Sequence, residues 1–302
     1  MKARRWRHGA LLGLVLAVAL VAAGCGDNGD SGGGSTGTTA AAAPAVDEAL
    51  AAKVPDEIKS DGKIVIGTDS SYPPNEFLDT DGKTVIGWDV DLFNAIAAKL
   101  GLKTEYRPAK FDAIIPGLQS GKYEFGVSSF TINDERMQQV NMVSYFNAGT
   151  QWGTKKGNPA GVQPGDACGK KVAVQTATVQ ETEDLPKRQA ACKSAGKPAI
   201  TVDSYQDQGQ ATAAVVSGKD DAMLADSPVV AYAVKQTNGQ LELLGDIYDA
   251  APYGYVVKKD QTEFAQATAD AVKALITDGT YKTILDKWGV QAGAIDNPAV
   301  NP

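Results

Sequence analysis

The feature that most constrains the fold is a regular alternation between strand patterns and helix patterns. Apolar or β-branched runs at 63–68, 104–107 and 124–127 predict three short strands. Between them, apolar residues recur at helical spacing over 90–100, and a second helical pattern covers 114–119. Strands that alternate with helices form open, largely parallel sheets covered by helices. The sequence therefore predicts an α/β fold.

The same alternation resumes after Trp152. Strand patterns occur at 171–175, 199–202 and 222–225, and helix patterns at 178–195, 208–217 and 229–236. A short repeat links the two series, because Ser120-Gly121-Lys122 and Ser217-Gly218-Lys219 each precede a strand at a constant offset of 97 residues. This turn is common enough to recur by coincidence. Taken as a true repeat, it places Ser129 and Asp226 at equivalent strand ends and predicts two similar lobes.

The C-terminal part contains one strand pattern at 252–258, followed by helix patterns at 264–276 and 281–288. Because a single strand cannot build a third lobe, this part is expected to complete the first one. We therefore expect lobe 1 at 55–148 plus 252–302 and lobe 2 at 149–251. The chain then crosses twice between the lobes, which predicts a two-strand hinge between two open, mainly parallel sheets. Ligands of such sheets bind at the carboxyl ends of the strands, here in a cleft between the lobes.

The first 24 residues have the features of an export signal. Basic residues precede an apolar stretch at 11–23 that is too short to span a bilayer, and Ala22-Ala23-Gly24-Cys25 follows as a small-residue cleavage site. The ending Gly24-Cys25 resembles a bacterial lipobox, which predicts lipidation of Cys25 and anchoring at the outer face of the cell membrane. A plain secretory signal cut nearby is the alternative. The pair Arg4-Arg5 leaves export by either the Sec or the twin-arginine route open.

The segment 25–54 is expected to be a flexible tether, because residues 26–46 are rich in Gly, Ser, Thr and Ala without apolar periodicity. Removal of residues 1–24 takes four of the 29 basic side chains and none of the 36 acidic ones, which leaves a net charge of −11. This charge argues against nucleic-acid binding. The only histidine, His8, leaves as well. The mature chain therefore cannot build a Ser-His or Cys-His nucleophile or a His-ligated zinc site, and we expect no cofactor or metal.

Two further cysteines, Cys168 and Cys192, lie in the expected second lobe. In an oxidising exterior such a pair predicts one disulfide. Two free buried thiols are the alternative.

The stretch 126–136, GVSSFTINDER, reads as a strand, a hydroxyl-rich turn and a helix start. Free backbone N–H groups and hydroxyls at a helix start form an anion site, and an arginine there can hold a planar carboxylate through two parallel bonds. Ser128, Ser129, Thr131 and Arg136 are therefore predicted to bind a carboxylate. An ordinary capped helix with a solvated arginine is the alternative. Arg107 and Arg188 compete for this role but have no hydroxyl turn nearby.

Residues 63 to about 290 resemble the bacterial extracellular solute-binding protein family 3, whose members serve ABC importers of polar amino acids. The matching motifs are Gly67-Thr68-Asp69 with Tyr72-Pro73-Pro74, Gly87-Trp88-Asp89-Val90-Asp91-Leu92, Ser128-Ser129 with Thr131 and Arg136, Val172-Ala173-Val174-Gln175 with Gln180, and Asp221-Ala222 with Asp226. The resemblance implies a two-lobed, type II periplasmic-binding-protein fold. It also implies a receptor that binds an amino acid, acts as a monomer and delivers its ligand to the permease subunits.

The resemblance assigns roles to individual residues. Arg136 is expected to hold the ligand α-carboxylate with Thr131 and backbone N–H groups around Thr178, and Asp226 to bind the α-ammonium with Ser129 and Thr131. Tyr72 and Trp88 are expected to sandwich the ligand side chain, and Asp69 to meet its polar end. Ser128 and Gln175 complete the expected ligand-binding set.

Several of these roles have simpler alternatives. Asp226 precedes Ser227-Pro228 and can serve as a helix N-cap only, Asp69 can be a turn residue, and Tyr72 and Trp88 can be core residues. Asn75 stands where the family usually has phenylalanine, and it can make a polar contact or face solvent. Val179 replaces a common threonine, which leaves its side-chain contact in doubt.

The expected charges favour a basic ligand. Arg136 and Asp226 neutralise the ligand backbone and Asp69 remains, which favours a cationic side chain; glutamine is the alternative, because a carboxylate also accepts an amide N–H. A further alternative is a cyclohexadienyl dehydratase-like enzyme on the same fold. The predicted site argues against it, because it offers a partner for both charged groups of an amino acid. A receptor that signals without transport is not distinguished by the sequence.

Overall fold

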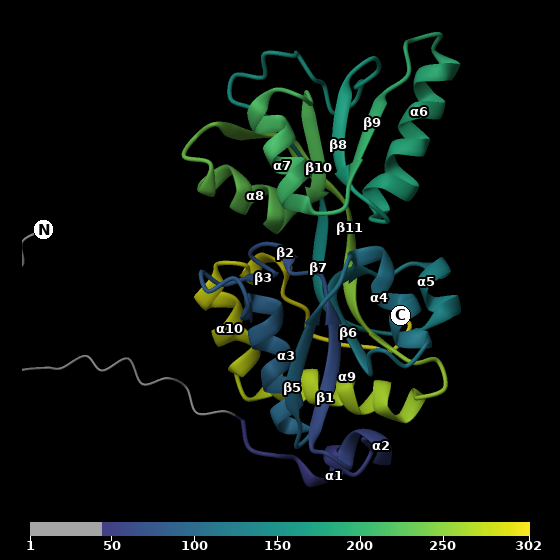
Figure 1. Ribbon diagram of the computed structural model, residues 1–302, viewed down its shortest axis with the longest axis vertical. Coiled ribbons are helices and arrows are strands. Elements are labelled where there is room, and N and C mark those ends of the chain that lie inside the picture. Colours follow the sequence, from purple (N-terminus) through teal and green to yellow (C-terminus); the bar gives the residue numbers. More distant parts are fainter. Residues whose placement is uncertain (1–43) are drawn as a thin grey trace, which may run out of the picture. The chain divides into compact units, whose positions relative to one another are not determined.

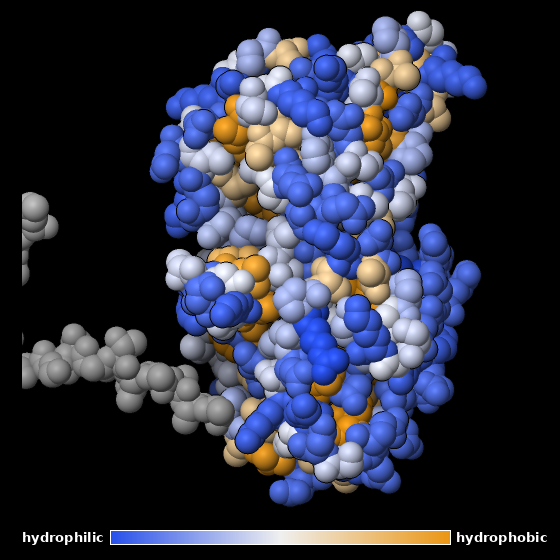
Figure 2. Space-filling model, in the orientation of Figure 1, coloured by the Kyte–Doolittle hydropathy of each residue, from blue (hydrophilic) through white to orange (hydrophobic). Residues whose placement is uncertain are grey.

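The computed structural model describes residues 44–302. The predicted signal peptide, the lipidation site Cys25 and most of the predicted tether lie outside the described residues. Within residues 44–302 no helix is long and apolar enough to cross a membrane. Figure 2 shows a surface on which hydrophilic residues predominate and hydrophobic ones form small separate patches.

Lobe 1 is built on three parallel strands in the spatial order β5, β1, β6, and helices cover both faces (Figure 1). Its strands are β1 (Lys63–Thr68), β5 (Lys103–Pro108) and β6 (Phe125–Thr131), with a small antiparallel sheet of β2 (Ser71–Tyr72), β3 (Glu76–Leu78) and β4 (Val85–Ile86). Its helices are α1 (Glu48–Ala51), α2 (Asp56–Lys59), α3 (Trp88–Lys99), α4 (Phe111–Gln119), α5 (Asp134–Gln139), α9 (Thr262–Thr277), α10 (Thr280–Trp288) and η2 (Gln291–Gly293).

Two apolar layers sandwich the sheet of lobe 1. The larger layer joins α3 and α9 to the sheet through side chains such as Phe93 and Phe264, which both pack against Phe125 of β6. The smaller layer lies under α4 and contains Ile114 and Leu118. Helix α4 buries one side against the sheet, and α3 packs against the sheet and against α9 and α10, so the helical spacing of their apolar residues follows from this packing.

Lobe 2 has the same architecture, with the parallel strands β10, β8 and β9. Its strands are β8 (Lys171–Gln175), β9 (Thr201–Tyr205) and β10 (Ala222–Asp226), and its helices are the π-helix η1 (Gln180–Asp184), α6 (Leu185–Ser194), α7 (Gln208–Ser217) and α8 (Ser227–Gln236). One apolar cluster lies under α7 and α8, and a second lies on the α6 side of the sheet. The predicted α/β fold is confirmed, although the strands of the two lobes belong to one continuous sheet rather than to two.

Two long antiparallel strands, β7 (Asn141–Lys155) and β11 (Leu241–Val257), run through both lobes. In lobe 1 β11 pairs with β6, and in lobe 2 β7 pairs with β10, so the two sheets form one continuous order β5-β1-β6-β11-β7-β10-β8-β9. The register of the two long strands shifts between Leu244 and Tyr248 and again before Ala251. The hydrogen-bonded pairing of β7 with β11 is thus interrupted where the two strands pass from one lobe to the other.

Two segments differ from the sequence predictions. Residues 241–251 were not predicted as a strand, yet they form the first part of β11. Residues 48–54 were expected in the tether, but Asp47 caps helix α1, and Leu50 and Val54 are buried in the core of lobe 1. The predicted start of the folded part at residue 55 is therefore too late.

The predicted disulfide is confirmed. Cys168 and Cys192 are joined across a sequence separation of 24 residues, and Cys192 lies buried in the apolar cluster beside α6.

Gly87, at the start of α3, allows a close approach that no other residue can make. Its φ is +142°, and a Cβ there would lie 1.9 Å from the backbone oxygen of Asn75. We expect Gly87→Ala to lower the free energy of unfolding by about 2 to 4 kcal/mol, because the clash is with backbone. Gly209→Ala is the matched control, since Gly209 lies inside α7 with open space around it. Denaturant unfolding measures both, and equal effects would contradict the argument.

Candidate functional site

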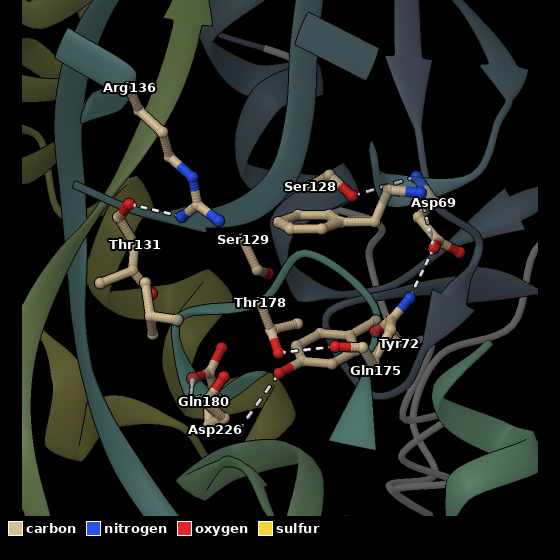
Figure 3. A pocket seen from close by; sticks show the side chains of 12 residues that line it. Asp69, Tyr72, Ser128, Ser129, Thr131, Arg136, Gln175, Thr178, Gln180 and Asp226 are labelled. Atoms are coloured by element: carbon tan, nitrogen blue, oxygen red, sulfur yellow. Dashed lines mark hydrogen bonds between the residues drawn. The ribbon is translucent and has the colours of Figure 1, made fainter. Parts of the chain in front are cut away.

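A narrow cavity lies between the two lobes, at the carboxyl ends of β1, β6, β8 and β10 (Figure 3). Lobe 1 contributes residues 69, 72, 111, 128, 129, 131 and 136, and lobe 2 contributes residues 175, 178, 179, 180 and 226. Nine of the ten predicted ligand-binding residues line this cavity: Asp69, Tyr72, Ser128, Ser129, Thr131, Arg136, Gln175, Thr178 and Asp226.

Arg136 is the cationic residue of the cavity lining. Asn133 caps helix α5 and accepts a hydrogen bond from the Arg136 backbone N–H at 2.9 Å, which is the predicted helix start. The guanidinium donates to the carbonyls of Thr131 at 2.7 Å and of Ala177, in lobe 2, at 2.9 Å. It also lies over the ring of Phe111. Burial lowers the pKa of Arg136 to about 10, so the side chain stays positively charged at neutral pH.

Asp226 lies opposite, at the end of β10. Its carboxylate accepts hydrogen bonds from the Tyr253 hydroxyl at 2.6 Å and from Gln180 Nε2 at 2.8 Å. Although it occupies the N-cap position of α8, its side chain makes no capping hydrogen bond, so the capping alternative does not account for it. Burial raises the pKa of Asp226, whereas these hydrogen bonds and the charge of Arg136 lower it.

Asp69 joins the two lobes at the other end of the cavity. Its Oδ1 accepts from the Ser71 backbone N–H at 3.0 Å, and its Oδ2 accepts from the Phe111 N–H at 3.2 Å and from Gln175 Nε2 at 2.7 Å. It is therefore both a turn residue and a lining residue. Burial is the main cause that raises the pKa of this carboxyl.

The hydroxyl residues lie between these charges (Figure 3). Ser128 accepts from the Asp69 backbone N–H at 3.0 Å, and Thr178 donates to the Gln175 carbonyl at 2.7 Å. The Tyr72 hydroxyl accepts from the Asp226 N–H at 3.2 Å and so bridges the lobes. Ser129 has a φ of +50°, an uncommon conformation, and lies within β6 where the pairing with β11 shifts register.

Trp88 does not line the cavity, contrary to the prediction. It is fully buried in the core of lobe 1, where its ring packs 4.4 Å from that of Phe146 and its indole N–H donates to Asn75 Oδ1 at 2.7 Å. Its position at the first turn of α3 directs it into the core rather than toward the strand ends. Asn75 is buried as well, so it makes a polar contact and does not face solvent.

Three lining residues were missing from the predicted set: Phe111, Val179 and Gln180. Phe111 begins the helix that follows β5, so its place after a strand's carboxyl end was an available signal. Gln180 belonged to one of the quoted motifs but received no role. Val179 lines the cavity although its contact had been in doubt.

The two competing arginines lie elsewhere. Arg107 pairs with Glu105 and is half exposed. Arg188 pairs with Asp184 and lies over the rings of Trp152 and Tyr248. Neither belongs to the cavity lining.

The lobes also touch outside the cavity. Lys110 forms an ion pair with Asp207, and Asn133 donates to Glu183 at 2.7 Å. These contacts, together with those of Asp69 and Arg136, place the two lobes in a closed arrangement. Within the part of the chain that the structure describes, no group of three or more His, Cys, Asp or Glu residues could hold a metal ion.

The sequence model described as "Bacterial extracellular solute-binding proteins, family 3" matches residues 64–291. The chain belongs to this family. Among relatives of this family 3 protein is the arginine-binding protein ArgT of Corynebacterium glutamicum, with 36% identity over 252 residues that cover 83% of this chain and 82% of that one. Another is the L-cystine-binding protein TcyJ of Escherichia coli K12, with 29% identity, which covers 95% of this chain and 97% of that one.

Solved structures resemble this family 3 protein as well. An ancestral arginine-binding protein bound to glutamine has a TM-score of 0.69 and 35% identity, and covers 76% of this chain and 98% of that one. The ancestral amino acid-binding protein AncCDT-1, described as a precursor of cyclohexadienyl dehydratase, has a TM-score of 0.68 and 34% identity, and covers 77% and 98%. The family and these relatives are solute-binding proteins, so the chain belongs to a class of binding proteins rather than enzymes.

Proposed function

We propose that this protein captures a basic amino acid in the cavity and delivers it to the permease subunits of an ABC transporter. The observation that carries the proposal is that Arg136 on lobe 1 and Asp226 on lobe 2 line one buried cavity. A zwitterion needs one fixed cation and one fixed anion, and these two residues supply them. The roles given to the remaining lining residues rest on this assignment.

The charge of the cavity supports a basic side chain. Once Arg136 and Asp226 are matched to the ligand backbone, Asp69 remains as an unmatched carboxylate in a site where burial makes charge costly. Of its oxygens, Oδ2 already accepts two hydrogen bonds and Oδ1 accepts one, so Oδ1 keeps a lone pair for the ligand. A guanidinium or ammonium supplies both the missing charge and the missing donor.

Glutamine is the second candidate, because its amide N–H can also donate to Asp69. The similarity to an ancestral arginine-binding protein whose structure holds glutamine supports it. The relatives that are named for arginine, including ArgT, support a basic ligand.

Asp69→Asn separates the two ligands. We expect the substitution to weaken L-arginine binding by about 10- to 100-fold and L-glutamine binding by about threefold or less, because it removes a charge but keeps a hydrogen-bonding group. Calorimetric titration of ligand-stripped mature protein against the twenty amino acids, ornithine and citrulline, before and after the substitution, measures this. Equal losses for both ligands would contradict the role given to Asp69, and binding of no amino acid would contradict the proposed function.

The proposed protein is a monomer held at the outer face of the cell membrane by a lipid on Cys25. The sequence Ala22-Ala23-Gly24-Cys25 supports this placement. Cys25→Ala should release the protein from the membrane fraction, which cell fractionation measures.

A further inference from the structure

The hydroxyl of Ser129, central among the lining residues in Figure 3, forms hydrogen bonds with two residues that do not line the cavity. Asn75 Nδ2 donates to Ser129 Oγ at 2.9 Å, and Ser129 Oγ lies 3.0 Å from Glu76 Oε2. Asn75 and Glu76 are completely buried. Neither residue has a part in the proposed grip on the ligand.

The directions of these hydrogen bonds are fixed by one group, the indole of Trp88. An indole N–H can only donate, so the Asn75 atom that faces it must be the oxygen, at 2.7 Å. The Asn75 amide nitrogen therefore faces Ser129 and donates to it. Because a hydroxyl has one hydrogen and two lone pairs, Ser129 directs its hydrogen to Glu76 and keeps one lone pair free.

A second buried acid, Asp89, lies beside Glu76, because the Asp89 backbone N–H donates to the carbonyl of the preceding residue, Asn75, at 3.2 Å. Glu76 Oε1 and Asp89 Oδ1 have no hydrogen-bond partner among the described residues, and both side chains are completely buried. The Tyr145 hydroxyl donates to the other Asp89 oxygen at 2.6 Å. Neither acid forms an ion pair within residues 44–302. One proton retained by this pair of acids removes one of two buried charges and supplies a donor for the orphan oxygens.

We propose that Glu76 and Asp89 share one proton, and that the chain Trp88, Asn75, Glu76 acts as a set of positioning residues that keeps the Ser129 hydrogen away from the cavity. The free lone pair of Ser129 then faces the ligand as a fixed acceptor. This inference rests on the proposed function. A fixed acceptor makes Ser129 selective for the ligand's α-ammonium group, which can only donate hydrogen bonds.

The surroundings of the acid pair are consistent with a retained proton. Burial and the neighbouring Asp89 raise the pKa of Glu76 well above its usual range, and burial raises the pKa of Asp89 to about 7. The ionisable groups around the pair are acids or neutral phenols: Asp69, Asp226, Tyr72, Tyr106, Tyr145, Tyr253 and Tyr255. Burial also raises the pKa of each of these phenols well above its usual range, so they remain uncharged.

Two variants of Glu76 test the positioning role. In Glu76→Gln the amide can donate to Asp89 and its oxygen can accept from Ser129, which reproduces the protonated acid. In Glu76→Leu that acceptor is lost, and the Ser129 hydrogen is free to turn toward the cavity. The probes are L-arginine and 5-guanidinopentanoic acid, which lacks only the α-amino group, with L-glutamine and 5-amino-5-oxopentanoic acid as a parallel pair.

We expect Glu76→Leu to weaken binding of the amino acid by about tenfold or more, while its des-amino analogue changes by about threefold or less. Glu76→Gln should keep both affinities within about threefold of the wild type. The positioning role would be overturned if Glu76→Leu weakened binding of the amino acid and of its des-amino analogue to the same extent. It would also be overturned if Glu76→Gln weakened amino-acid binding as much as Glu76→Leu does. Failure of the wild type to bind any amino acid would instead contradict the proposed function.

A second measurement tests the shared proton without any ligand. Because the folded protein holds a proton on Glu76 that the unfolded chain releases, wild-type stability should fall as pH rises from about 5 to about 8. Asp69 and Asp226 contribute equally to the pH dependence of stability in the wild type and in Glu76→Gln. The difference in pH dependence between these two proteins therefore reports on Glu76 and Asp89. Identical slopes for the two proteins would overturn the shared proton, whether or not Glu76→Leu folds.

Discussion

Replacing Arg136 with alanine should abolish amino-acid binding in the micromolar range while leaving the protein folded. In the proposed complex the buried guanidinium faces the ligand α-carboxylate, and removal of one partner of such a pair costs about 2 to 5 kcal/mol, or about 30-fold to several thousand-fold in affinity. The loss should apply to every amino acid, because each carries the same carboxylate. Calorimetric titration measures the affinity, and circular dichroism checks the fold.

Arg107→Ala provides the matched control for Arg136→Ala. It removes the same charge from lobe 1, but Arg107 is half exposed, pairs with Glu105 and lies outside the cavity. We expect this variant to bind within about twofold of the wild type, because solvent and salt screen an exposed charge. Retained binding in Arg136→Ala, or a comparable loss in Arg107→Ala, would remove the basis for placing the carboxylate at Arg136.

The second large effect concerns stability. Replacing Cys168 and Cys192 together with serine should lower the free energy of unfolding by about 3 to 4 kcal/mol, because the disulfide closes a loop of about 25 residues in the unfolded chain. Denaturant unfolding measures the change. Reduction of the wild-type protein should produce a similar shift, which serves as a check that does not add a polar serine to the buried cluster. An unfolding midpoint that is insensitive to reduction would contradict the estimate.

Much of the fold was predictable because its signals are local. The strand at 63–68, the helix at 208–217 and the strand-to-helix stretch at 126–136 each carry their own pattern of apolar and polar residues, although the strand of that stretch continues through the hydroxyl residues to Thr131. The carboxyl ends of parallel strands then bring Ser129 and Asp226 to one cavity by topology alone. Local sequence patterns, together with the repeat at an offset of 97 residues, sufficed for these inferences.

The errors arise where distant contacts decide the structure. The segment 241–251 has no clear strand pattern, but it pairs with β7, whose sequence lies about ninety residues earlier. Residues 48–54 are short and weakly patterned, and only packing against lobe 1 orders them. Trp88 was assigned to the ligand through the family resemblance, whereas its side chain is buried in the core of lobe 1 at the start of α3.

The strand pair β7 and β11 has a mechanical consequence. The chain enters lobe 2 along β7 and leaves it along β11, and both ends of the described chain, at helix α1 and at the C-terminal segment beside β7, belong to lobe 1. A pulling force applied between residues 44 and 302 therefore loads lobe 1 alone. Lobe 2 stays outside the path of tension and is joined to lobe 1 by its two strands. In the proposed receptor, closure over a ligand is then decoupled from any strain that a membrane anchor places on the ends of the protein.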